Sequence, residues 1–159
     1  INNSIEKILN TLKENDLQLI WQTGKNYYDR YKNLNFATVK VFDFIDDMNK
    51  AYSACDLLVA RAGATTIAEL TVLGLPAILI PSPNVAENHQ YHNAKSLSDE
   101  NAAVLIKDDE LDSELQQIIL NLITDSEKLN QLASNARRLA KPNAAKEIAL
   151  SAIKYAQMI

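Results

Sequence analysis

A short run of residues contains the side chains and backbone groups best suited to binding an anion and a sugar. The run follows the apolar stretch Leu57–Ala60, and its candidate binding residues are Arg61, Gly63, Ala64, Thr65, Thr66 and Glu69. We expect a helix to begin after Gly63, whose missing side chain allows a tight turn and the close approach of another group. The free N–H groups and positive dipole end of such a helix, together with the threonine hydroxyls, suit a diphosphate. Thr66 and Glu69 are three residues apart and share one helix face, where a carboxylate accepts hydrogen bonds from the vicinal hydroxyls of a ribose.

The same residues also fit a purely structural interpretation. Thr66 and Glu69 have the spacing of a capping box, in which the threonine side chain caps the helix and the glutamate reaches back. Their place after a strand favours a binding role, since ligands of parallel α/β proteins lie at the carboxyl ends of strands. Both interpretations remain open on the sequence.

A second polar segment follows the next apolar run. His89 and Gln90 lie near the start of a predicted helix and offer hydrogen bonds to sugar hydroxyls, although a solvated helix start has the same composition. His89 and His92 have no suitable carboxylate or cysteine nearby beyond Glu87, so we predict no metal site. Neither histidine lies in a recognisable serine or cysteine triad, so no catalytic residue is predicted.

An apolar segment follows another predicted strand. Phe44, Ile45 and Met48 suit a pocket for a flat base, with a backbone group reading the edge of the base. The alternative is a helix capped by Asp46, with Ile45 and Met48 in the core.

Hydrophobic periodicity predicts strands and helices in alternation. The predicted strands are Leu17–Gln22, Thr38–Phe42, Asp56–Ala60, Pro76–Pro81 and Ala102–Ile106. A first helix capped by Asn3 or Ser4 precedes them, and the later helices are Tyr27–Leu34, Asp46–Ala54, Ala64–Leu73, Glu87–Ser98, Leu111–Ile123, Glu127–Ala140 and Ala144–Met158. The last helix has an apolar stripe. Gly74, followed by Pro76, is expected to end the helix Ala64–Leu73. This order predicts an α/β protein with a doubly wound parallel sheet and extra C-terminal helices.

Composition limits the classes of function. With 159 residues and 47% apolar content the chain fits one globular domain, residues 1–159. The net charge of -4 argues against a nucleic-acid partner. The single cysteine, Cys55, is expected to pack as a small apolar residue, in keeping with a cytoplasmic location. No apolar run is long enough to span a membrane, and no cofactor is predicted.

These segments together resemble the C-terminal domain of the MurG family of bacterial N-acetylglucosaminyltransferases. The resemblance rests on Trp21–Lys25 (WQTGK), on Phe44–Pro81 with its GATTIAEL and GLPAILIP runs, and on Glu87–Ala94 (ENHQYHNA). It implies a Rossmann-like, donor-binding half of a GT-B glycosyltransferase whose donor is UDP-N-acetylglucosamine. The implied donor-binding residues are Phe44, Ile45, Met48, Arg61, Gly63, Ala64, Thr65, Thr66, Glu69, His89 and Gln90.

The resemblance also assigns a role to each part of that set. Ile45 would read uracil through its backbone, Gly63 to Thr66 would face the diphosphate, Glu69 would accept the ribose hydroxyls, and Gln90 with His89 would bind the sugar. Ser often stands in the family where this chain has Ala62, and Gln where it has His89.

The family's remaining parts are not found in this sequence. The resemblance implies a first strand and a glycine-rich phosphate loop ahead of Ile1, and an acceptor domain that binds the lipid-linked muramylpentapeptide. The implied enzyme is an inverting transferase of peptidoglycan synthesis, peripheral on the inner face of the plasma membrane. The present chain alone is expected to be inactive. The donor half of another GT-B enzyme and a non-catalytic nucleotide-binding module are the alternatives.

Overall fold

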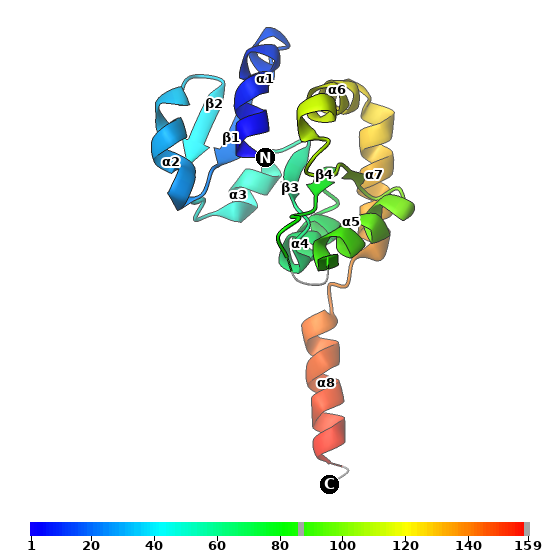
Figure 1. Cartoon of the computed structure of the whole chain (residues 1–159). Coiled ribbons are helices and arrows are strands. Elements are labelled where there is room, and N and C mark those ends of the chain that lie inside the picture. Colours follow the sequence, from blue (N-terminus) through cyan, green and yellow to red (C-terminus); the bar gives the residue numbers. More distant parts are fainter. Residues whose placement is uncertain (86–87, 158–159) are drawn as a thin grey trace.

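Helices and short strands alternate along the chain in the computed structural model, which describes residues 1–85 and 88–157 (Figure 1). The helices are α1 (Asn2–Glu14), α2 (Lys25–Tyr31), the 3-10 helix η1 (Lys32–Leu34), α3 (Met48–Ser53), α4 (Ala64–Leu73), α5 (His89–Asp99), α6 (Leu111–Thr124), α7 (Ser126–Leu139) and α8 (Ala144–Ala156). The strands are β1 (Leu19–Gln22), β2 (Val39–Phe42), β3 (Leu58–Arg61), β4 (Ala77–Ile80) and β5 (Val104–Leu105). The predicted order is confirmed, and the expected start of the α5 helix at Glu87 lies outside the described residues.

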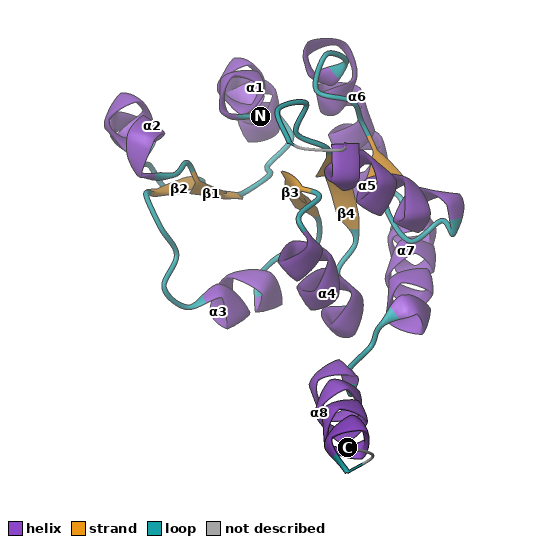
Figure 2. Cartoon of the chain, turned by 60° about the horizontal axis from the view of Figure 1, so that its bottom comes forward, coloured by secondary structure: helices purple, strands orange, loops and turns teal. Residues whose placement is uncertain are grey.

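The strands pair in parallel, as predicted, but they form two sheets. One sheet has the order β1-β2 and the other β3-β4-β5. Leu19 pairs with Val39 in the first sheet, and Leu58 pairs with Ala77 in the second. Figures 1 and 2 show β1 as the strand of its pair that lies nearer to β3. The parallel α/β class is therefore confirmed, but the strands form two separate sheets, and the gap between the sheets lies between β1 and β3.

Helices cover both faces of these strands. Figure 2 shows α1 and α2 on one side of the strands and α3 and α4 on the other. The side chains of β4 alternate accordingly, since Ile78 and Ile80 belong to one apolar cluster and Ala77 and Leu79 to another. All four are fully buried, which explains why this strand has an unbroken apolar sequence.

The two clusters draw on different helices. The first contains residues of α1 and α6, and the second contains Tyr52, Ala62 and Leu70 around α3 and α4. Cys55 packs against the second cluster as predicted, and burial raises the pKa of its thiol.

Several predicted helix caps are wrong. The N-cap of α1 is Ile1, and Asn3 and Ser4 lie inside the helix, where Ser4 donates to Asp112 Oδ1 at 2.8 Å and Asn3 Oδ1 accepts from the Tyr31 hydroxyl at 2.9 Å. The N-cap of α3 is Asp47, which accepts from the Lys50 backbone N–H at 3.2 Å, so Asp46 does not cap it. The predicted cap is thus misplaced at both helix starts, by one residue at α3.

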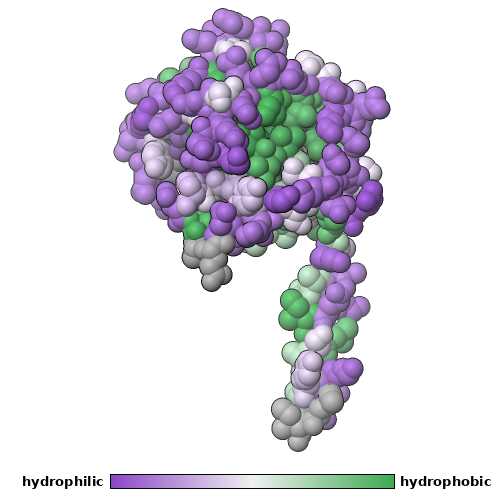
Figure 3. Space-filling model, turned by 45° about the vertical axis from the view of Figure 1, so that its right-hand side comes forward, coloured by the Kyte–Doolittle hydropathy of each residue, from purple (hydrophilic) through white to green (hydrophobic). Residues whose placement is uncertain are grey.

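The apolar stripe of α8 does not pack on the rest of the chain. The helix projects away from the body in Figure 1, and Figure 3 shows apolar side chains spread along it. Every residue of α8 is exposed, including Ile148 and Ile153. Among the described residues no helix is long and apolar enough to cross a membrane.

Candidate functional site

The N-terminus of α4 carries no side-chain cap. Gly63 is the N-cap residue, and its carbonyl accepts the first helical hydrogen bond from Ile67 at 3.0 Å. The capping box expected between Thr66 and Glu69 does not form, so the structural interpretation of this pair is wrong. Within residues 1–85 and 88–157, the first N–H groups of the helix therefore remain available at the carboxyl end of β3, beside the exposed Thr65 and the half-buried Thr66.

Gly63 does not make the conformational turn that we expected of it. Its φ of -69° and ψ of 146° are extended backbone that any residue adopts. A Cβ built on it meets only Thr66 Oγ1, at 3.8 Å. The described residues therefore leave room for a side chain at position 63, so a requirement for glycine here would come from a bound molecule that approaches the backbone closely.

Glu69 turns to the neighbouring helix α3 and not back to its own N-terminus. The Tyr52 hydroxyl donates to Glu69 Oε2 at 2.8 Å. Burial of the phenol, and then its hydrogen bond to this carboxylate, raises the pKa of Tyr52 to about 12. Tyr52 is thus a neutral donor at neutral pH, and it fixes the direction of an otherwise exposed carboxylate.

The apolar segment after β2 lies beside the end of β1. Ile45 and Met48 are half-buried and Phe44 is 57% exposed, so a flat aromatic surface is accessible here. The backbone N–H of Ile45 donates to Gln22 Oε1 at 2.9 Å. Gln22, the last residue of β1, therefore already accepts a hydrogen bond from the Ile45 N–H, the backbone group that the family resemblance assigns to uracil.

The start of α5 is held against the ends of β4 and β3. Gln90 Oε1 accepts from the Ser82 backbone N–H at 2.9 Å, and Asn93 Nδ2 donates to the Ala62 carbonyl at 3.2 Å. The side-chain amide oxygen of Gln90 is thereby directed at the segment after β4. His89 is exposed at the first position of the helix, one residue away.

Arg61 joins the ends of β3 and β4 to the segment after β5. Its guanidinium forms an ion pair with Asp108 and donates to the Pro81 carbonyl at 3.1 Å. Both partners of the ion pair are about one-third exposed. Arg61 thus connects the end of β3 to the segments that follow β4 and β5.

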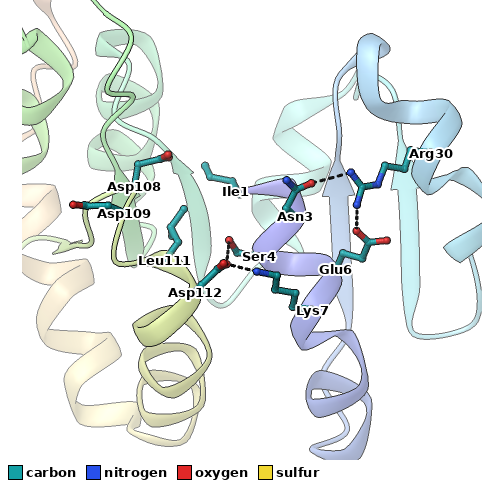
Figure 4. Close-up of a pocket in the computed structure, with 10 residues that line it drawn as sticks. All are labelled: Ile1, Asn3, Ser4, Glu6, Lys7, Arg30, Asp108, Asp109, Leu111 and Asp112. Atoms are coloured by element: carbon teal, nitrogen blue, oxygen red, sulfur yellow. Dashed lines mark hydrogen bonds and ion pairs between the residues drawn. The ribbon is translucent and has the colours of Figure 1, made fainter.

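A separate pocket of about 550 Å³ lies between the start of α1 and the segment after β5 (Figure 4). None of the candidate binding residues lines it. Its walls carry charges of both signs, with Arg30 paired to Glu6 and Lys7 to Asp112. Hydrogen bonds from Lys7 and Ser4 lower the pKa of Asp112. In the described part of the chain, no group of His, Cys, Asp and Glu side chains is arranged to hold a metal ion.

The structure therefore brings the candidate residues to the carboxyl ends of four strands. Phe44 and Ile45 follow β2 beside the end of β1, the α4 start follows β3, and Gln90 contacts the segment after β4. The sequence alone missed Gln22, Tyr52, Asn93 and Asp108, which hold these segments. Gln22, Tyr52 and Asn93 lie within the sequence runs already singled out, so their polar side chains were the available signal.

A comparison of the sequence with models of known protein families shows to which family the chain belongs. The model of the glycosyltransferase family 28 C-terminal domain matches residues 1–148. The chain belongs to this family. The parallel α/β fold agrees with this assignment.

Curated relatives and solved structures agree with this family 28 assignment. UDP-N-acetylglucosamine--N-acetylmuramyl-(pentapeptide) pyrophosphoryl-undecaprenol N-acetylglucosamine transferase of Cytophaga hutchinsonii is 47% identical over 148 residues, 93% of this chain and 40% of the relative. The enzyme of the same name from Bacteroides thetaiotaomicron is 45% identical over 163 residues, 99% of this chain and 44% of the relative. The crystal structure of Acinetobacter baumannii MurG superposes with a TM-score of 0.72 at 32% identity, over 82% of this chain and 41% of that one. The chain thus spans about two-fifths of the length of the curated relatives it matches.

Proposed function

We propose that this chain is the UDP-N-acetylglucosamine-binding half of an N-acetylglucosaminyltransferase that acts on the lipid-linked muramylpentapeptide. The observations that carry the proposal are the uncapped start of α4 and the position of Glu69 on the same helix, where Tyr52 of α3 donates a hydrogen bond to it. Thr66 and Glu69 are separated by roughly 4.5 Å along the helix axis. A diphosphate at the helix start therefore places the attached ribose beside the carboxylate.

The other candidate residues are assigned to the rest of the donor. Phe44 and Met48 line the uracil, and the Ile45 backbone reads its edge once Gln22 moves away. His89 and Gln90 bind the sugar hydroxyls, since Gln90 Nε2 has no hydrogen-bond partner within the described residues. Arg61 holds the loops around the diphosphate, through its contacts with Asp108 and the Pro81 carbonyl.

In the proposed reaction an acceptor hydroxyl attacks the anomeric carbon with inversion, and UDP leaves. Negative charge grows on the departing diphosphate as the glycosidic bond breaks. The helix start of α4 stabilises this charge more in the transition state than in the ground state. The chain would supply donor binding and leaving-group stabilisation, with the catalytic base and the acceptor site in another domain at the inner face of the plasma membrane.

We propose further that the two sheets are parts of one sheet completed by an additional strand. Along β3 every residue is half-buried, whereas the neighbouring β4 is fully buried. The facing edges of β1 and β3 have no strand between them within the described residues. A strand inserted there would hydrogen-bond to both sheets and would place its carboxyl end near the other strand ends of the site.

Titration of the chain with UDP-N-acetylglucosamine, UDP-glucose and UDP tests the proposed function. We expect all three to bind, with UDP-N-acetylglucosamine favoured over UDP-glucose, and E69A to weaken each of them about tenfold or more. E147A removes a carboxylate from the projecting helix α8 and should leave the affinities unchanged. Absence of uridine nucleotide binding, or equal binding by E69A and the parent chain, would refute the proposal.

A further inference from the structure

The hydroxyl of Tyr52 is directed at the carboxylate to which the ribose is assigned. It donates to Glu69 Oε2 at 2.8 Å, and within residues 1–85 and 88–157 no other group is hydrogen-bonded to this side chain. Oε1 and the remaining lone pair of Oε2 therefore stay available. A ribose offers two adjacent O–H donors, which matches these acceptors.

The two partners differ in how firmly the protein holds them. Tyr52 is only 8% exposed and packs in the apolar cluster with Ala62 and Leu70. Glu69 is exposed, and its long side chain has several rotamers of similar energy. The buried phenol thus provides a fixed point, and the carboxylate takes its direction from it.

Protein stability gives little reason for this contact. Without the phenol hydroxyl, the exposed Glu69 carboxylate is solvated by water, so Y52F leaves no buried polar group unsatisfied. Tyr52 already anchors α3 through its ring, which a phenylalanine would do equally well. The hydroxyl therefore matters chiefly for the orientation of Glu69.

The place of Tyr52 on α3 also connects the ribose acceptor with the proposed base pocket. Met48 lies one helical turn before Tyr52, and it packs against the same apolar cluster. One short helix thereby carries a wall of the base pocket and the residue that orients Glu69. Base and ribose contacts are set by the same structural element.

Resting on the proposed function, we infer that Tyr52 is a positioning residue that directs Glu69 toward the two ribose hydroxyls and so favours ribonucleotides over their deoxy counterparts. Because the carboxylate is already oriented, the ligand has less conformational freedom to remove when it binds. Burial and the Glu69 hydrogen bond raise the pKa of Tyr52 to about 12, which keeps the hydroxyl protonated at neutral and mildly alkaline pH.

The test compares UDP with 2′,3′-dideoxy-UDP as ligands of the parent chain and of Y52F, by NMR titration into the millimolar range. Y52F should bind UDP roughly fivefold to tenfold more weakly, because one oriented hydrogen bond to a charged group is lost. Its affinity for the dideoxy nucleotide, which has no hydroxyls for Glu69 to accept from, should equal that of the parent. Y155F, which removes a phenol hydroxyl from the exposed helix α8, should match the parent for both ligands.

A double-substitution cycle separates positioning from general loosening of the fold. In an E69A background the Y52F substitution should have no further effect on UDP affinity, because its only route to the ligand is removed. An equal loss of affinity for both nucleotides, or an unchanged affinity of Y52F for UDP, would overturn the inference while leaving the proposed function intact. Failure of the parent chain to bind UDP would refute the proposed function, and the inference with it.

Discussion

Replacing Gly74 by alanine tests how the C-terminus of α4 is held, and with it the helix that carries Glu69. Gly74 has the left-handed φ of 64° and ψ of 44°. Its N–H donates to the Thr71 carbonyl at 3.2 Å, and the Leu75 N–H donates to the Leu70 carbonyl at 3.0 Å. This is the Schellman arrangement, in which a glycine ends the helix without steric cost.

The cost of G74A has separate contributions. The left-handed conformation costs a non-glycine residue about 1–2 kcal/mol. The lower entropy of the unfolded chain returns roughly 0.4–1 kcal/mol of this. The added Cβ would lie 2.6 Å from Arg137 Cγ and 2.7 Å from its Cζ, so this side chain must move. Moving it breaks the hydrogen bond from Arg137 to the Leu73 carbonyl at 3.2 Å, for about 0.5–1.5 kcal/mol.

These contributions give a net destabilisation of about 2 kcal/mol for G74A. Urea unfolding at 25 °C measures it, in the parent chain and in an R137A background. With the arginine already removed, G74A should cost only about 1 kcal/mol, since the backbone strain alone remains. Equal costs in both backgrounds would show that Arg137 does not restrict this position.

G63A is the matched control, because it makes the same chemical change at the other end of α4. Its φ of -69° is compatible with alanine, and the new Cβ would meet only Thr66 Oγ1 at 3.8 Å. G63A should therefore leave the stability unchanged or raise it by up to about 1 kcal/mol. A cost for G74A below about 0.5 kcal/mol, or a cost for G63A similar to that of G74A, would refute the account of this helix.

Two further predictions concern α8 and Tyr52. A chain ending at residue 140 should keep the melting temperature of the parent in calorimetry, because every described residue of α8 is exposed; a fall of several degrees would show that α8 packs on the body in solution. The free energy of unfolding should fall as the pH rises from about 10 to 12, because the pKa of Tyr52 near 12 makes the unfolded chain release this proton first. In urea unfolding at pH 10 and pH 12, the free energy of unfolding of Y52F should fall less between the two pH values than that of the parent. An identical fall in both chains would argue against a buried Tyr52 phenol.

Local sequence patterns were sufficient for most of the fold. An unbroken apolar run located β4, which is buried on both faces, and the segment between Gly63 and Gly74 located α4. The left-handed cap at Gly74 followed from a glycine and a proline at the end of a helical pattern. These features depend on residues close together in the sequence.

The predictions that were wrong concern polar side chains with distant partners. Ser4 binds Asp112 across 108 positions, and Glu69 binds Tyr52 across 17. A capping pattern states which local hydrogen bond is possible, but the folded chain offered each side chain a competing partner. The division of the strands into two sheets was likewise not foreseen, since pairing depends on which strands lie side by side.

The polar groups of the candidate site also differ in how much a donor molecule would gain from them. The Ile45 N–H is already bonded to Gln22 and Gln90 Oε1 to Ser82, so a ligand that replaces these partners exchanges one hydrogen bond for another. The first N–H groups of α4 and Oε1 of Glu69 have no such partner among the described residues and give up only water. Under the proposed function, diphosphate and ribose therefore provide most of the affinity. The base contributes mainly selectivity, because only a base with the correct edge compensates for the displaced Gln22.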